Sequence, residues 1–305
     1  MKKKIQSKFT YTLVLLLGLA SSAFAGETGN YVNGVEGIKA ATLPGPGFYY
    51  KMYNTYYTAD SVTDKDGKDI SAANLDLTVF ANVHRFIWGT GVKVLGADLI
   101  VDMLVPLVYT DISMNTPGGK VEEDSFGVGD ICFEPAALAW HGAAYDVAAG
   151  IGFFAPTGEY DKTDPSSAGK DMWAMMLTLG GTLYFDTEKT WTASILARYE
   201  THTEKSDLEI KPGDEIHFEW GVGKTVMKII DLGVSGYCTW QITDDSGDGV
   251  TYDKSVHDRV FAVGPEIDVF IPQIMAAVSL RAQKEFGAVD RAEGYVSTLA
   301  LTKIF

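Results

Sequence analysis

Ionisable side chains recur at every second position in two segments of this chain. Arg198, Glu200 and His202 follow one another in this way, and so do His217 and Glu219 further along. In an extended strand this spacing puts the side chains on one face. If the two strands pair, opposite charges meet across them. We expect a cross-strand network that either braces the wall of a narrow interior or selects solutes by charge and hydrogen bonding.

The same alternation assigns a larger set of polar residues to this inward face, and acids outnumber bases in it. The full inward set is Tyr49, Lys51, Tyr53, Asp76, His84, Asp98, Asp102, Asp130, Glu134, Arg198, Glu200, His202, His217, Glu219, Glu266, Asp268, Arg281 and Glu285. The residues that we predict to line a solute path are Tyr49, Lys51, Tyr53, Asp130, Glu134, Arg198, Glu200, His217, Glu219, Arg281 and Glu285.

The sequence carries no motif for catalysis or for metal binding. It has no Gly-x-Ser-x-Gly elbow, no His/Cys cluster with zinc spacing and no phosphate loop. The acidic stretch 244–249 resembles the first half of a calcium loop, but Ser255 stands where a glutamate is needed. We predict a protein that is not an enzyme and uses no cofactor or metal. For the acidic loops two interpretations stay open, a solvated surface or a divalent-cation bridge to lipopolysaccharide.

Most of the chain divides into segments of roughly a dozen residues with period-two hydrophobicity. In residues 75–84, for example, every odd position is apolar and most even positions are polar. We predict an all-β fold, a closed antiparallel up-and-down transmembrane β-barrel of about 12 strands. The predicted strands are 47–58, 74–87, 97–110, 125–139, 144–156, 172–185, 190–203, 214–226, 230–243, 257–270, 273–285 and 294–305.

The connections alternate between long and short, as expected when one end of a barrel faces the cell exterior and the other the periplasm. The predicted long, acidic, extracellular loops are 59–73, 111–124, 157–171, 204–213, 244–256 and 286–293. The intervening periplasmic turns are short, except for a longer one expected at 88–96.

The two ends of the chain support export to an outer membrane. Residues 1–25 carry lysines, then an apolar run, then Ala23-Phe24-Ala25, which is typical of a cleaved signal peptide. The final strand ends in Phe305, a terminal aromatic typical of outer-membrane barrels. Residues 26–46 are rich in proline and glycine, and either lie in the periplasmic mouth as a plug or form a mobile tail. Residues 47–305 form the predicted barrel.

Charge and cysteine content limit the partners. The chain has 25 Lys and Arg against 40 Asp and Glu, a net charge of −15, and such a chain repels nucleic acid. Cys132 and Cys238 fall on opposite faces of their predicted strands, so we expect no disulfide between them.

Several segments together resemble one family, the outer-membrane proteins homologous to the MetA pathway of phenol degradation. The matching segments are Gly127-Val128-Gly129-Asp130, the strand down to Trp140-His141, Phe154 to Tyr160, Gly213 to His217, Thr243 to Gly247, Val263-Gly264-Pro265 and Glu285 to Ala288. The resemblance implies an outer-membrane channel associated with uptake of aromatic or other hydrophobic compounds.

These observations lead to one functional expectation and two alternatives. We expect a Gram-negative outer-membrane channel for passive uptake of small hydrophobic or aromatic solutes. The alternatives are a non-specific or cation-preferring porin and a structural barrel with a filled lumen. The expected partners are outer-membrane lipid and lipopolysaccharide, the solute, and the barrel-assembly machinery, which would recognise the strand ending in Phe305.

Overall fold

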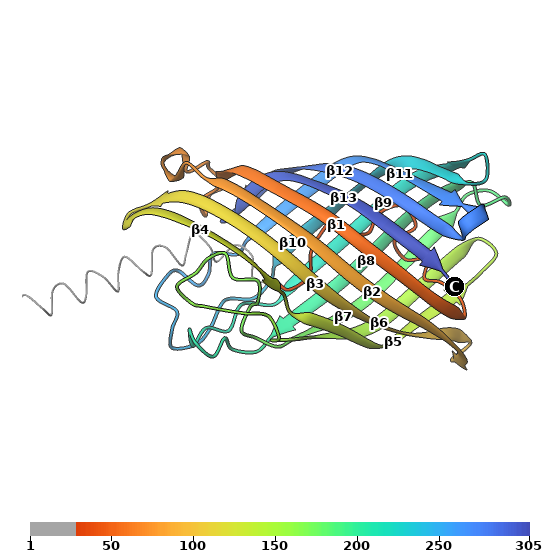
Figure 1. The fold of residues 1–305 in the computed structure, drawn as a ribbon, viewed down its shortest axis with the longest axis horizontal. Helices are drawn as coiled ribbons and strands as arrows, with labels where there is room; N and C mark the ends of the chain where they lie inside the picture. Colours follow the sequence, from red (N-terminus) through yellow and green to blue (C-terminus); the bar gives the residue numbers. More distant parts are fainter. Residues whose placement is uncertain (1–28) are drawn as a thin grey trace, which may run out of the picture.

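Residues 29–305 are described by a computed structural model, and they form a closed antiparallel β-barrel (Figure 1). The predicted signal peptide, residues 1–25, lies outside the described residues. With one exception, strands that follow one another along the chain pair with each other, and the first, β1 (Gly47–Val62), also pairs with the last, β13 (Ala292–Ile304). This pairing closes the ring, so the predicted fold class is confirmed.

The described residues form thirteen strands, but these occupy twelve positions around the ring. β4 (Gly119–Val128) pairs with the second half of β3 (Ala97–Thr116), and β5 (Ile131–His141) pairs with its first half, so that β4 and β5 do not pair with each other. The single strand predicted at 125–139 is therefore broken at residues 129–130. The remaining strands are β2 (Asp76–Val94), β6 (Tyr145–Ala155), β7 (Ala174–Tyr184), β8 (Trp191–His202), β9 (Glu215–Val226), β10 (Ile230–Gln241), β11 (Arg259–Ile271) and β12 (Ala276–Val289).

The alternation of the sequence explains the two faces of the wall. On β8, for example, Leu196, Arg198 and Glu200 are buried, whereas Trp191 and Ile195 are exposed. Apolar side chains outward and polar side chains inward are the arrangement of a membrane barrel. Two short 3-10 helices lie in connections between strands, Ser71–Ala73 between β1 and β2 and Pro272–Ile274 between β11 and β12. Among residues 29–305, no helix is long and apolar enough to cross a membrane.

The barrel has a turn end and a loop end. At the turn end the predicted long turn 88–96 is wrong, because β2 continues to Val94 and only two residues link it to β3. Those two, Leu95 and Gly96, have φ of 51° and 81°, as a tight hairpin requires. At the loop end the predicted loop 286–293 shrinks to two residues between β12 and β13. The β3–β4 hairpin projects beyond its neighbours there (Figure 1).

Candidate functional site in the barrel lumen

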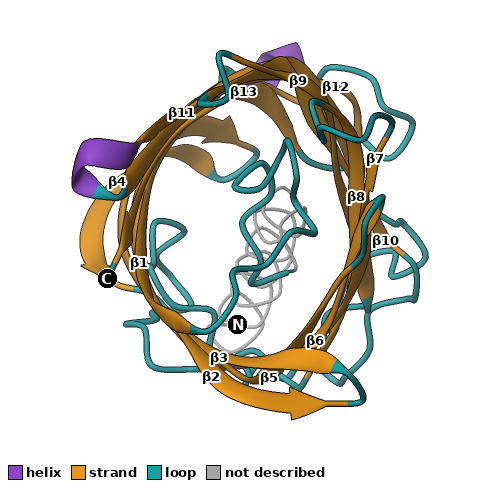
Figure 2. Ribbon diagram, turned by 90° about the vertical axis from the view of Figure 1, so that its right-hand side faces the viewer, coloured by secondary structure: helices purple, strands orange, loops and turns teal. Residues whose placement is uncertain are grey.

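Residues 29–46, which precede β1, lie inside the barrel (Figure 2). Near the loop end the backbone N–H of Asn30 donates to Glu200 at 2.6 Å, and at the turn end the chain passes into β1 at Gly47. The inner segment, as we call residues 29–46, therefore runs lengthwise through the lumen rather than occupying one mouth alone.

Small residues allow the inner segment to approach the wall closely. A Cβ atom added at Gly221 on β9 would lie 2.6 Å from the backbone N of Ile38. Glycine within a strand often marks such a place, where another backbone comes near. Elsewhere Val35 joins a buried apolar cluster with Tyr53 and Ala300 of the wall.

Carboxylates of the wall bind backbone N–H groups of the inner segment. The segment is not a strand of the sheet, so its buried N–H groups need other acceptors. Hydrogen bonds to charged acceptors are the stronger kind. The bonds run from Asn30 to Glu200 (2.6 Å), from Tyr31 to Glu200 (3.2 Å), from Glu36 to Glu219 (2.9 Å) and from Ile38 to Glu266 (3.1 Å).

The side chain of Glu36 reverses this polarity, because here the segment supplies the acid and the wall supplies the donors. Its carboxylate lies 2.9 Å from Lys51 Nζ and 3.5 Å from Arg85 Nη1. It also accepts a hydrogen bond of 2.5 Å from the hydroxyl of Tyr53. The register places Lys51 of β1 directly opposite Arg85 of β2, which brings the donors together.

Each lumen arginine also pairs with acids of the wall. Cross-strand register explains two of these groupings, since Asp102 lies opposite Glu134 and Glu266 lies opposite Arg281. The pairs are Arg85 with Asp102 (2.6 Å) and Glu134 (2.8 Å), Arg198 with Glu219 (2.5 Å), and Arg281 with Glu266 (2.9 Å). Arg281 also donates to the backbone carbonyl of Val35 in the inner segment.

Near the loop end the two histidines of the predicted network are paired with acids. His202 lies 3.1 Å from Glu200, and His217 lies 3.1 Å from Glu215. β8 and β9 pair with Arg198 opposite His217. Because Glu200 also holds the start of the inner segment, this group joins two strands to the segment.

Asp130 connects three parts of the molecule at the break between β4 and β5. Its carboxylate accepts hydrogen bonds from the backbone N–H of Gly158 (2.9 Å) and of Lys170 (3.0 Å), both in the β6–β7 loop. It also accepts one from the side-chain amide of Asn30 (3.0 Å). The loop and the inner segment are therefore fixed to the wall at the place where the strand is interrupted.

All eleven residues predicted for a solute path are buried or partly buried on the lumen side of the wall. Two of them have not yet been described. Glu285 accepts hydrogen bonds from Tyr57 (2.9 Å) and Tyr237 (2.6 Å), and Tyr49 packs against the same buried apolar cluster as Leu43 of the inner segment. Their role in solute passage stays a prediction.

The prediction for β2 is wrong, because Asp76 and His84 face outward. His84 hydrogen-bonds Tyr50 at 2.6 Å, and Tyr50 lies against the exposed Phe86. The inward residues of β2 are Ala81, Val83, Arg85 and Ile87. Ala81, Val83 and Ile87 are apolar although they face inward, because they pack against other wall residues and the inner segment. The rule that the polar face points inward therefore gave the wrong face for β2, and Arg85 was not predicted to line the lumen.

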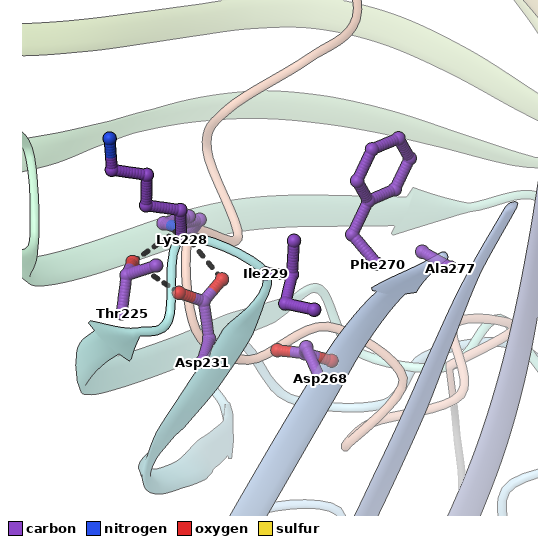
Figure 3. Close-up of a pocket in the computed structure, with 8 residues that line it drawn as sticks. Thr225, Lys228, Ile229, Asp231, Asp268, Phe270 and Ala277 are labelled. Atoms are coloured by element: carbon purple, nitrogen blue, oxygen red, sulfur yellow. Dashed lines mark hydrogen bonds and ion pairs between the residues drawn. The ribbon is translucent and has the colours of Figure 1, made fainter. Parts of the chain in front are cut away.

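Within residues 29–305, two cavities beside the inner segment are of interest. The larger, of about 300 Å³, opens at the turn end between Lys39 and strands β9 to β12. Figure 3 shows Thr225 and Asp231 on one side of this cavity and Phe270 and Ala277 on the other. The smaller, of about 30 Å³, lies deeper in the lumen beside Glu36 and Arg85.

Neither a metal site nor a disulfide is found within residues 29–305. No group of three or more His, Cys, Asp or Glu residues in this range could hold a metal ion. Cys132 is a buried free thiol beside the smaller cavity, and Cys238 is a half-buried free thiol.

Comparison with known proteins identifies the family. The family described as the MetA-pathway of phenol degradation matches residues 59–300. The chain belongs to this family. The resemblance predicted from the sequence is thereby confirmed, and the match covers more than half of the chain. No curated protein matches the chain significantly.

Solved structures share the barrel of this family member at low identity. An outer-membrane channel from Pseudomonas putida F1 is 16% identical, with a TM-score of 0.74 over 91% of this chain and 100% of that one. The β domain of the Bordetella autotransporter BrkA is 12% identical, with a TM-score of 0.50 over 86% and 100%. At such identities the likeness concerns the fold.

Proposed function

We propose that the protein is an outer-membrane channel for the passive uptake of small hydrophobic or aromatic compounds. The inner segment would close the channel until it moves. The loop end would face the cell exterior and the turn end the periplasm. The outer surface would contact lipid and lipopolysaccharide, and the strand ending in Phe305 would be recognised by the barrel-assembly machinery.

The observation that carries the proposal is the large number of buried charges between the wall and the inner segment. Buried ion pairs add little stability compared with a well-packed apolar core. A barrel with a purely structural role would therefore gain more from apolar filling. Ionisable groups within the membrane span usually mark a solute or ion pathway. The cavity of about 300 Å³ at the turn end adds unfilled space on that pathway.

Membership of the family and the likeness to the Pseudomonas putida channel support the same proposal. The lumen charges are arranged in ion pairs and in hydrogen bonds to the backbone of the inner segment. We infer a role in transport without chemistry.

Conductance of the refolded protein in a planar bilayer tests the proposal. We expect discrete steps that a neutral aromatic such as phenol blocks in a saturable manner. Steady conductance that no aromatic saturates would instead indicate a general porin. Silence of the native protein and of Gly221→Ala, a variant that should loosen the inner segment, would indicate a structural barrel.

A further inference from the structure

The donors that hold Glu36 form a carboxylate-binding group that does not depend on the inner segment. Lys51 and Tyr53 lie on β1 and Arg85 on β2, so the strand pairing alone brings them together. An ammonium, a guanidinium and a phenol hydroxyl around one carboxylate supply both charge and directed hydrogen bonds. If Glu36 leaves, the three donors remain in place with no carboxylate from the segment.

Beside these donors the lumen turns apolar. The cavity of about 30 Å³ has an apolar part of its lining, formed by Val35, Leu104, Phe154 and Met176, beside the charged residues Glu36, Arg85, Glu134 and Arg198. A few convergent polar groups next to an apolar lining are the usual composition of a small-molecule site. The polar part would hold an acid group and the apolar part a ring.

The size of the cavity ties such a site to movement of the inner segment. An apolar cavity needs about 150 Å³ to admit benzene, and the space here is about 30 Å³. Val35 and Glu36 both line the cavity and both belong to the inner segment. Withdrawal of these two side chains would merge the small cavity with the space around the donors.

The ion pair of Lys51 favours an anion over a neutral solute. Arg85 is held by the wall carboxylates Asp102 and Glu134, whereas Lys51 is paired with Glu36 of the inner segment. A monoanion replaces Glu36 charge for charge, whereas a neutral solute leaves the Lys51 ammonium without its partner, which is costly when buried. The buried Nε of Arg85 also has no hydrogen-bond partner among the described residues.

We propose that Lys51, Tyr53 and Arg85 bind the carboxylate of a small aromatic acid, and that Glu36 occupies this site as an internal competitor. The proposal rests on the proposed channel function, because the acid reaches the site through the lumen. Within the proposed class of aromatic solutes, it specifies aromatic monocarboxylates, which bind when the inner segment moves aside.

Block of single-channel current by benzoate, with benzamide as its neutral isostere, tests the proposal. Glu36→Gln removes the charge of the competitor, so the half-blocking concentration should fall roughly tenfold more for benzoate than for benzamide. Lys51→Met removes a donor, so the concentration should rise about 10- to 100-fold for benzoate alone. Titration calorimetry on the detergent-solubilised protein should give the same order of affinities.

A matched control separates recognition from simple loosening. Lys39 anchors the same inner segment through Asp231 at 2.7 Å, away from the donors. In Lys39→Met the half-blocking concentrations of benzoate and benzamide should therefore change by the same factor relative to the native protein. In Glu36→Gln they should not. Heat-dependent gel migration confirms that each variant is folded.

The possible failures are distinguishable. Equal half-blocking concentrations for benzoate and benzamide in the native protein and in both site variants would overturn the carboxylate site and leave the channel intact. A selective gain for benzoate in Lys39→Met as large as in Glu36→Gln would also overturn it. Absence of conductance in the native protein and in all variants, including Lys39→Met with its loosened inner segment, would overturn the proposed function itself.

Discussion

Replacement of Gly221 by alanine should open the channel without altering a single charge. Gly221 lies on β9, at a place where the backbone of the inner segment passes close to the wall. Its Cβ would meet Ile38 N at 2.6 Å and the carbonyl carbon of Gly37 at 2.7 Å, both of them backbone atoms. β9 is hydrogen-bonded on both sides, to β8 and β10, so the segment should give way before the wall.

The size of the effect follows from these distances. To reach ordinary contact the segment must retreat from 2.6 Å to about 3.4 Å, a shift of about 0.8 Å. The bond from Ile38 N to Glu266, now 3.1 Å, would then exceed the limit of a useful hydrogen bond. Loss of one bond to a charged acceptor costs about 1.5 to 3 kcal/mol. The ratio of open to closed channels should therefore rise about 10- to 100-fold.

Single-channel recording measures this ratio directly as the open probability. Gly181→Ala is the matched control, because a Cβ there would find its nearest atom, a carbonyl oxygen of Asp146, at 3.6 Å. That variant should behave like the native protein. An unchanged open probability in a folded Gly221→Ala protein, or an equal rise in Gly181→Ala, would refute the view that the inner segment closes the channel.

Two further predictions concern the loop end. Asp130→Ala removes the acceptor for two N–H groups of the β6–β7 loop and for the side-chain amide of Asn30. Limited proteolysis of this loop should be faster, and the free energy of unfolding should fall by on the order of 3 kcal/mol. An unchanged cleavage rate would contradict the role of Asp130. Burial, reinforced by Asp245, raises the pKa of the Asp290 carboxyl in the β12–β13 turn to about 6 from 3.8. Its stabilising contribution is therefore complete below about pH 4 and is lost as the pH rises through about 6. Amide protection at this turn, corrected for intrinsic exchange, should be lower at pH 7 than at pH 5 in the native protein and equal in Asp290→Asn; the same pH dependence in both would exclude Asp290 as the cause.

The ring of strands could be predicted because period-two alternation is a property of each strand by itself. The break at residues 129–130 could not, because the alternation continues on both sides of it. What ends the pairing there is tertiary: β4 has only β3 as a neighbour, while Asp130 takes its partners from a distant loop and from the inner segment.

The candidate site was predicted for β8 and β9, where charge marks the inward face, and missed on β2, where it does not. Arg85 carried a usable signal, because an arginine facing lipid at mid-membrane is costly. Fixing the face of β2 on this one residue would have placed His84 outward. Glu36 gave no signal, since its partners are separated from it in sequence and meet it only once the barrel exists.

The lengthwise course of the inner segment constrains the order of assembly. β1 follows the segment directly, and its partner β13 is the last strand of the chain; the backbone N–H of Phe305 bonds to Phe48 at this seam. If the barrel closed first, the inner segment would have to be drawn through a narrow lumen lined with charged side chains. If the wall instead folds around the segment, that step is avoided. Glu200, Glu219 and Glu266 can then bind the segment before β1 pairs with β13.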